Sequence, residues 1–392
     1  MVRPHDIVIP PETRWLNDPA AAEVCGVIEA AGYEIFFVGG CVRNAIIGQA
    51  DSDVDMSTNA LPECVMEIAE AAGLKAVPTG IDHGTVTVVA QGAPFEITTF
   101  RRDVDTDGRR AVVAFSEDIS DDARRRDFTM NALYATAQGQ IVDPLDGLPD
   151  LLARRIRFIE DPAARIREDY LRILRFFRFF AWYADPMEGF DADAMAAIAA
   201  NIDGLERLSA ERVGQEMAKL LSAPDPGPAL AAMRQTGVLP TVLPGADDCF
   251  VPILVHLEGE LSFEPCWINR LALLGGENVA ERFRLSKADA RRLGLMQDIG
   301  FNGPPLAEIA YRHGVNVAQG AMLLRAALAR ETPELSLLET ISEASRAIFP
   351  VKAADLQPDY QGPALGAKLK ELEQRWIDSG FSLGKVALLK GV

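Results

Sequence analysis

The segment GGCVRNAIIGQADSDVDMST (residues 39–58) combines a glycine turn, a short helix and a strand that carries paired acids. Asp53 and Asp55 are two residues apart, so a strand through them points both carboxylates to one face, where they can converge on divalent cations. DSDVD could instead open an EF-hand calcium loop. That loop requires Gly at its sixth position and Glu at its twelfth, where this chain has Met56 and Pro62. The pattern therefore favours a carboxylate pair on a strand.

The glycines lie thirteen and fourteen residues before Asp53 and suit a different ligand. The backbone amides after Gly39 and Gly40 lie at a predicted helix N-terminus, which is a natural site for a triphosphate, and Arg43 follows within a turn. A Gly-Gly pair alone is usually only a turn, and an Asp-x-Asp alone is usually a polar strand end. Together at this spacing they indicate phosphoryl or nucleotidyl transfer, in which the protein positions the groups and two metal ions stabilise the attacking and leaving oxygens.

Short strands and helices alternate around this segment. Apolar periodicity and β-branched residues predict helices over 18–32 and 61–73 and strands over 33–38, 54–58, 84–90 and 95–100. Residues 101–120 contain an Asp-Gly turn among many charges, which predicts a mobile hairpin or loop. The first 150 residues are thus expected to form an α/β domain with a small mixed sheet.

Helical patterns run almost without interruption from about residue 160. N-cap residues followed by apolar positions three and four apart predict helices over 191–202, 209–221, 286–299 and 366–379. Pro/Gly clusters at 224–228, 303–305 and 358–363 mark the expected joints. We therefore expect an all-helical C-terminal half, divided into a helical domain over 151–222 and a helical body and tail over 223–392.

Composition excludes several other classes. The chain has 392 residues with a net charge of −18, and 48% of its residues are hydrophobic, as in ordinary globular proteins of two or three domains. Five scattered cysteines and four histidines without ligand spacing argue against disulfides and a zinc centre and for a reducing cytoplasm. No stretch has the length and apolarity of a signal peptide or a membrane span, so we expect no membrane association. Nothing in the sequence indicates an obligate protein partner.

Two further segments are rich in arginine. In RRRDFTMNALY (124–134) the arginines lead into an apolar stretch that is predicted to be helical, which draws Arg126 towards the packed body and within reach of a phosphate. The alternative is a solvated surface.

In REDYLRILRFFRFFAWY (167–183), Asp169 and Arg172 are three apart on a predicted helix and can act together. An Arg donor and an Asp acceptor match the Watson–Crick edges of cytosine and adenine. Arg175 and Arg178 continue the step, but at 100° per residue the stripe winds around the helix. The other positions are apolar on nearly every side, so the helix must be buried and its arginines need partners. Structural salt bridges remain the alternative reading for all four charged residues.

These motifs resemble a known family. GGCVRNAIIG…DSDVD, FEITTFR, RRRDFTMNA and EDYLRILRFFRF occur in the order and at the spacing of the bacterial (class II) CCA-adding tRNA nucleotidyltransferases and poly(A) polymerases, members of the polymerase β nucleotidyltransferase superfamily. The resemblance implies roles for matching positions. It implies that Asp53 and Asp55 bind magnesium and are catalytic, with Glu96 as a third carboxylate. It implies that the triphosphate is contacted by Gly39, Gly40, Arg43 and Arg126. It further implies that the base is selected by Asp169 and Arg172, and that Arg175 and Arg178 make additional nucleotide contacts.

One position departs from the family pattern, which usually reads GGxVRD. Here Asn44 replaces the aspartate, so a structural salt bridge is expected to be lost there while the metal pair is unaffected.

The resemblance implies a magnesium-dependent transferase that adds C, C and A to the 3′ acceptor end of tRNA from CTP and ATP and releases pyrophosphate. The segment PTGIDHGTVTVV (78–89) and the charged loop after FEITTFR favour full CCA addition. Alternatives are a poly(A) polymerase, an enzyme that adds only CC or only A, and a non-catalytic RNA-binding protein. Residues 154–178 contain eight arginines against four acids, a net charge of +4, which predicts that tRNA binds a narrow basic strip.

Overall fold

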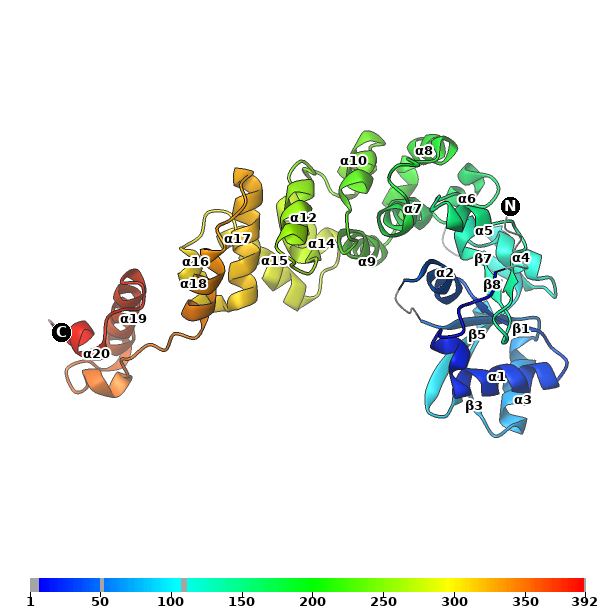
Figure 1. Ribbon diagram of the computed structural model, residues 1–392, viewed down its shortest axis with the longest axis horizontal. Helices are drawn as coiled ribbons and strands as arrows, with labels where there is room; N and C mark the ends of the chain where they lie inside the picture. The colour runs from blue at the N-terminus through cyan, green and yellow to red at the C-terminus, as the bar shows by residue number, and fades with distance from the viewer. Residues whose placement is uncertain (1–6, 50–52, 107–110, 391–392) are drawn as a thin grey trace. The chain divides into compact units, whose positions relative to one another are not determined.

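The computed structural model describes residues 7–49, 53–106 and 111–390, and the chain divides into two compact units (Figure 1). The first comprises residues 1–220 and 228–244, and the second comprises 221–227 and 245–392. The Pro/Gly cluster predicted at 224–228 lies where the two units meet along the chain. None of the helices in the described ranges is long and apolar enough to cross a bilayer.

A seven-stranded mixed sheet forms the base of the first unit. Its strand order is β3-β4-β5-β2-β1-β8-β9, and only the β2–β5 pair is parallel. The bounds are β1 Ile35–Val38, β2 Asp55–Thr58, β3 Lys75–Gly80, β4 Thr85–Ala90, β5 Ala93–Thr99, β8 Tyr134–Ala135 and β9 Ile141–Val142. The β-branched segment TVTVVA alternates half-buried and buried side chains along β4, as a strand covered more on one face requires. The predicted small mixed sheet is confirmed.

Helices cover the sheet on its two faces. The helices α1 (Pro19–Ala30) and α3 (Pro62–Ala71) pack against each other and against β4. On the other face, Phe36 of β1 meets Tyr134 at 6.3 Å between ring centroids, within a cluster that includes Val38. Because successive side chains of β1 point to opposite faces, this four-residue strand joins both layers.

The charged segment after β5 folds as the predicted hairpin, with strands β6 (Arg101–Thr106) and β7 (Ala111–Phe115) paired antiparallel. Its Asp-Gly turn lies outside the described residues. Helix α2 (Gly40–Ile47) follows β1, and α4 (Ile119–Arg124) and α5 (Leu148–Leu152) complete this part of the unit. Short 3₁₀ turns occur at Trp15–Asn17, Ile81–His83 and Thr129–Asn131.

The rest of the first unit is helical, as predicted. Its helices are α6 (Pro162–Glu168), α7 (Leu171–Tyr183), α8 (Ala192–Ala199), α9 (Ala210–Leu221), α10 (Gly227–Gln235) and α11 (Val238–Val242), with a 3₁₀ turn at Ile202–Arg207. Helix α7 is the core of this part. All its leucine, isoleucine and phenylalanine side chains are buried, and Phe176 stacks on Phe158 at 5.5 Å. The expectation that this arginine-bearing helix is buried is therefore confirmed.

The second unit is entirely helical within its described residues. It contains α12 (Val251–Glu260), α13 (Trp267–Leu274), α14 (Val279–Arg282), α15 (Lys287–Ile299), α16 (Leu306–His313), α17 (Val315–Ala329), α18 (Ser336–Ser345), α19 (Gly362–Asp378) and α20 (Lys385–Leu389), with a 3₁₀ turn at Ala353–Leu356. A buried ion pair between Arg270 and Glu258, at 2.7 Å, anchors its start, because Arg270 also donates to the carbonyl of Leu221. Near its end, Trp376 packs edge-on to Tyr311 at 5.4 Å.

Candidate active site

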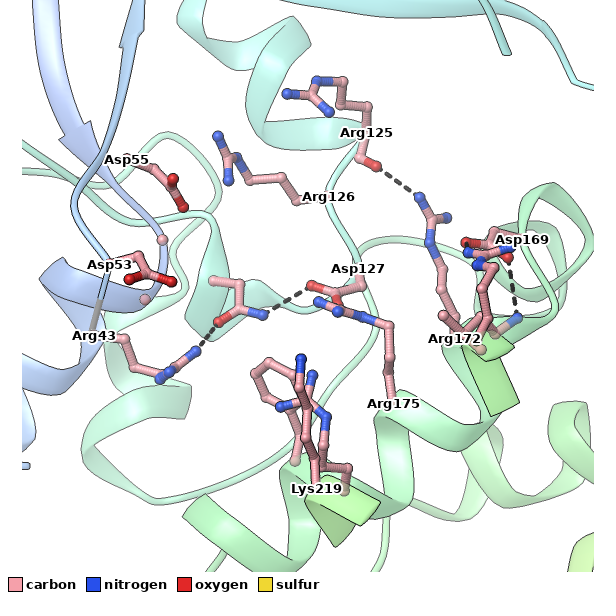
Figure 2. Close-up of a pocket in the computed structure, with 17 residues that line it drawn as sticks. Arg43, Asp53, Asp55, Arg125, Arg126, Asp127, Asp169, Arg172, Arg175 and Lys219 are labelled. Carbon is pink, nitrogen blue, oxygen red and sulfur yellow. Dashed lines mark hydrogen bonds and ion pairs between the residues drawn. The ribbon is translucent and has the colours of Figure 1, made fainter. Parts of the chain in front are cut away.

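One cavity of about 560 Å³ in the first unit is lined by most of the residues that the sequence predicted to be functional (Figure 2). It is lined by ten of the eleven predicted residues: Gly39, Gly40, Arg43, Asp53, Asp55, Arg126, Asp169, Arg172, Arg175 and Arg178. Eight lysine or arginine side chains line it against four aspartates, so its net charge is +4 in a chain of −18. A cationic cavity in an acidic protein suits a polyanionic ligand.

The glycine turn brings α2 to this cavity. Gly39 has φ +73°, a left-handed conformation that favours glycine, and it is the N-cap residue of α2. Gly40 is the first residue of the helix, so the backbone amides of its first turn have no partner within the helix. The sequence FFV-GG-CVRN therefore places a helix N-terminus directly after a buried strand and at the wall of the cavity.

The carboxylates approach the cavity from β2. Asp55 is the first residue of this strand and lies opposite Val38 on β1 and Glu96 on the parallel strand β5. Asp53 precedes the strand, so the prediction that both aspartates lie on it is wrong for Asp53. Figure 2 nevertheless shows both carboxylates directed into the cavity. Glu96 does not line the cavity. Its connection to the two aspartates is its position beside Asp55 on the neighbouring strand β5.

The charges around Asp55 fit a divalent cation. Partial burial, together with the nearby carboxylates of Glu96 and Asp53, raises the pKa of Asp55, although Arg126 opposes this effect. The rise means that ionised Asp55 is held in an unfavourable environment. Hard oxygen donors crowded in this way are the ligands that divalent cations such as Mg²⁺ prefer. The residues present therefore fit the predicted metal site.

Arg126 reaches the cavity by a different route from the one predicted. The arginines end helix α4, and only one 3₁₀ turn and the short strand β8 follow, so the predicted apolar helix after them is wrong. The apolar residues there instead enter the sheet and its core. Arg126 donates to Asp122 at 3.0 Å and to the Tyr134 hydroxyl at 3.2 Å. Although burial of Asp122 acts to raise its pKa, the cations Arg126 and Arg125 lower it to about 2.

Asp169 and Arg172 both line the cavity, and the backbone amide of Arg172 donates to the carbonyl of Asp169 at 3.0 Å, but they are not neighbours on one helix as predicted. Asp169 is not on the helix. Its backbone is extended between α6 and α7, and its carboxylate accepts from the amide of Leu171 at the start of α7. Its second oxygen pairs with Arg212 of α9 at 2.6 Å. The predicted helical i, i+3 pair is therefore wrong, because the aspartate is used to begin the helix rather than to continue it.

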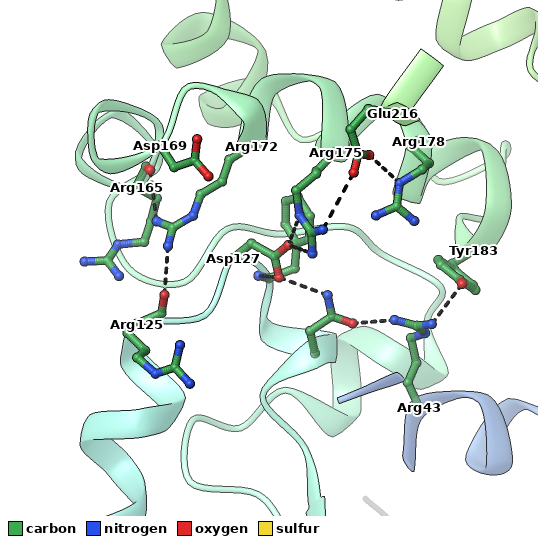
Figure 3. A network of polar contacts seen from close by, with 12 residues as sticks. Arg43, Arg125, Asp127, Arg165, Asp169, Arg172, Arg175, Arg178, Tyr183 and Glu216 are labelled. Atoms are coloured by element: carbon green, nitrogen blue, oxygen red, sulfur yellow. Dashed lines mark hydrogen bonds and ion pairs between the residues drawn. The ribbon is translucent and has the colours of Figure 1, made fainter. Parts of the chain in front are cut away.

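Arg172 is held by three acceptors from two other segments. It donates to Glu168 at 2.6 Å, to the carbonyl of Arg165 at 2.9 Å and to the carbonyl of Arg125 at 2.8 Å. A guanidinium has five N–H groups in a fixed plane, so these contacts set its orientation beside Asp169 (Figure 3).

Arg175 and Arg178 make the salt bridges that the sequence left as their alternative reading. Arg175 pairs with Asp127 at 2.5 Å, and Arg178 pairs with Glu216 of α9 at 2.6 Å. Burial of Asp127 acts to raise its pKa, but Arg175 and a hydrogen bond from Asn131 lower it to about 2. Both arginines also line the cavity, so their ion pairs fix them at its wall.

Sequence reasoning missed several residues of this cavity. Arg125, Asp127, Asn131, Phe179, Arg212 and Lys219 also line it. Asp127 and Asn131 belong to RRRDFTMNA, where a polar residue in an apolar run was an available signal. Arg212 and Lys219 lie on a separate helix, α9, and nothing in their local sequence indicates the site.

Comparison with known proteins agrees with this geometry. Residues 35–157 match the poly A polymerase head domain, and residues 189–250 match the "probable RNA and SrmB- binding site of polymerase A". The chain is 31% identical to the mouse mitochondrial CCA tRNA nucleotidyltransferase 1 over 97% of this chain and 91% of that protein. It is 34% identical to a CCA-adding enzyme of Streptococcus suis, over 92% of this chain and 93% of that protein.

A solved structure is also similar over nearly the whole chain. The Bacillus stearothermophilus CCA-adding enzyme, crystallised in complex with CTP, has a TM-score of 0.72 at 28% identity and covers 92% of this chain and 94% of that one. Sequence and fold thus agree along the same length of chain. The protein therefore belongs to the family of CCA-adding enzymes and poly(A) polymerases, which are nucleotidyltransferases.

Proposed function

We propose that this chain is a CCA-adding tRNA nucleotidyltransferase, which extends the 3′ end of tRNA with C, C and A from CTP and ATP. In each addition the terminal hydroxyl of the tRNA attacks the α-phosphate, a new phosphodiester forms, and pyrophosphate leaves. The observation that carries the proposal is the single cavity in which paired carboxylates, a helix N-terminus and a set of arginines meet. The tRNA and CTP named for its relatives are the substrates that this cavity suits.

At one end of the cavity, Asp53 and Asp55 would hold a divalent metal ion. Enzymes of this family generally use divalent metals, and we assign Mg²⁺ because the donors are carboxylate oxygens. When bound, the ion would stabilise the charge that develops on the attacking and leaving oxygens. Glu96, beside Asp55 on β5, would serve as a third carboxylate that strengthens the site from behind.

The phosphates of the nucleotide would lie between the metal site and the arginines. The amides that follow Gly39 and Gly40 donate to phosphate oxygens, and Arg43 and Arg126 supply positive charge from two sides of the cavity.

The base would be read at the other end of the cavity. Arg172 donates to base acceptors, and the carboxylate of Asp169 accepts from the exocyclic amino group that cytosine and adenine share. Uracil and guanine present a carbonyl where that amino group would be, so they leave the carboxylate without a donor. Arg175 and Arg178 continue the cationic wall beside the nucleotide.

The division of labour along the chain follows from these assignments. Residues 1–150 would form the catalytic head, 151–222 the base-recognition domain and 223–392 the tRNA-binding body and tail. The five cysteines are free thiols, which suits a reducing cytoplasm as the site of action.

Removing one carboxylate tests the proposal. Purified chain is incubated with labelled CTP, Mg²⁺ and tRNA that lacks CCA, in parallel with the Asp53→Ala variant and with Glu63→Gln, an exposed carboxylate outside the cavity. We expect incorporation by the wild type and by Glu63→Gln and none by Asp53→Ala. Incorporation by Asp53→Ala at the wild-type rate would contradict the mechanism.

A further inference from the structure

Arg43 differs from the other arginines of the cavity in the charge of its hydrogen-bond acceptors. Arg43 is 5% exposed and its side chain makes four hydrogen bonds, all to uncharged acceptors. Figure 3 shows the one to the Tyr183 hydroxyl. Nε and Nη2 donate to Oδ1 of Asn44 at 3.1 and 2.8 Å, Nη1 donates to Oδ1 of Asn131 at 2.5 Å, and Nη2 donates to the Tyr183 hydroxyl at 2.8 Å. Within the described residues, no ion pair joins Arg43 to a carboxylate.

Two aromatic rings complete the surroundings. The Arg43 guanidinium lies 4.0 Å from the ring centroid of Tyr183 and 5.2 Å from that of Phe179. Both rings belong to α7, the helix that begins beside Asp169, whereas Arg43 belongs to α2. An arginine over an aromatic face keeps its positive charge while its position is fixed.

The orientation of Asn131 is set from both sides. Its amide nitrogen donates to Asp127 at 2.9 Å, and its amide oxygen accepts from Arg43. A flipped amide would face the guanidinium with a donor and the carboxylate with an acceptor, which is unfavourable at both ends. Asp127 is in turn fixed by Arg175. The position of Arg43 is therefore tied to Arg175 of α7 through the amide of Asn131 and the carboxylate of Asp127.

The charge environment follows from these contacts. Burial lowers the pKa of Arg43, whereas contacts with Asp127 and Glu216 raise the pKa of Arg175 against the same burial effect. Arg43 is thus a desolvated cation with no ion pair among the described residues, and the carboxylate of Asp127, which it does not contact, offsets the burial only in part. A guanidinium has five N–H groups, and four are used, so one remains for a ligand at the cavity.

We propose that Asn44, Asn131 and Tyr183 form a neutral cradle that positions Arg43 and reserves its charge for the phosphates of the nucleotide. Tyr183 acts in it as a positioning residue that links the phosphate-binding end of the cavity to α7. The inference rests on the proposed function and deepens it, since it names the groups that set phosphate affinity.

Inorganic tripolyphosphate tests this cradle without involving the base or the tRNA. Its affinity is measured by calorimetric titration, in metal-free buffer, for the wild type, Asn44→Asp and Tyr183→Phe. Asn44→Asp is nearly isosteric and turns the main acceptor of Arg43 into a counter-charge, so we expect affinity to fall about tenfold. Tyr183→Phe keeps the ring and removes the hydroxyl, and we expect a fall of about threefold.

The matched control is Gln138→Glu, which adds the same charge at an exposed turn outside the cavity and should leave affinity unchanged. In steady-state assays, Asn44→Asp should raise KM for CTP and ATP by similar factors, with kcat and the preference for CTP over UTP unchanged. A purely structural role would lower kcat and the unfolding temperature instead.

Each outcome is informative. Equal tripolyphosphate affinity of the wild type and Asn44→Asp, or no affinity in either, would overturn the cradle. If the wild type bound tripolyphosphate more tightly than Asn44→Asp yet added no nucleotide to tRNA, the cradle would stand and the proposed function would fail.

Discussion

The two ends of the cavity differ in how their charges are arranged. At the β2 end, Asp53, Asp55 and Glu96 place like charges together, and the pKa of Asp55 is raised by partial burial and by the other two. At the α7 end the charges are matched, with Arg175 on Asp127 and Arg178 on Glu216. In the proposed function a divalent cation would bind at the first end, whereas the arginines of the second end already pair with carboxylates of the chain. The first end would then serve catalysis, and the ion pairs of the second end fix the positions of its arginines.

The largest effect is expected at the carboxylate end. Asp55→Asn would remove a proposed metal ligand, so CTP incorporation in a single-turnover assay should fall on the order of 10³-fold, which corresponds to about 4 kcal/mol. Thermal unfolding of the variant without metal should be unchanged or slightly higher, because repulsion among the three carboxylates is relieved. Loss of stability together with activity would contradict the assignment of this end.

The next largest effect is expected on base selection. Arg172→Ala removes the donor fixed by Glu168 and by the carbonyls of Arg165 and Arg125, so the kcat/KM preference for CTP over UTP should fall about 30-fold, or about 2 kcal/mol. Competition assays with both nucleotides measure the ratio directly. An unchanged preference would remove Arg172 from base reading, and Gln138→Glu again serves as the neutral comparison.

Acidification should change the contributions of the two ends to the free energy of unfolding in opposite directions. The folded-state pKa of Asp127 is lowered to about 2, so its contribution is fully present above its ordinary pKa and is lost as pH falls from about 4 to 2. Asp127→Asn should cost about 2 kcal/mol at pH 7 and roughly half of that at pH 3. Asp55, with a raised pKa, acts in the opposite direction, so Asp55→Asn should flatten the gain on acidification. Urea unfolding midpoints between pH 3 and 7 measure both, and identical pH profiles for the two variants would contradict the contrast.

The smallest effect is expected for Arg212. Its pair with Asp169 is partly exposed on both sides, so Arg212→Ala should cost less than about 1 kcal/mol in unfolding free energy. Arg212→Lys keeps the charge and should cost still less. A loss above 3 kcal/mol in the urea midpoint analysis would show that this pair belongs to the rigid core of the cavity.

Local patterns predicted the parts of the site whose partners are near in sequence. The glycine turn, β2 and the arginines of α7 were all predictable because spacing alone fixes which residues share a turn, a strand or a helix face. The start of α7 was not, since neither Pro nor Gly marks the break at Asp169. That break depends on a carboxylate that caps the next helix and pairs with α9.

The remaining partners could not be predicted because they come from distant segments. Asp127 reaches Arg175 across 48 positions, and Tyr183 reaches Arg43 across 140. Such pairs depend on how the helices pack on the sheet, which no periodicity encodes. The basic strip predicted over residues 154–178 is also altered by packing, because Arg155, Arg157 and Arg165 pair with nearby acids.

If this chain is a CCA-adding enzyme, a single cavity adds C, C and A to the tRNA 3′ end and adds no further nucleotide. The direct measurement is nucleotide addition by the wild-type chain to three tRNA acceptors, which end before CCA, after C and after CC, with CTP alone, ATP alone and both together. We expect all three acceptors to end in CCA when both nucleotides are present, and ATP alone to extend only the acceptor that ends in CC. Long adenosine tails, or addition limited to CC or to A, would contradict full CCA addition by this chain.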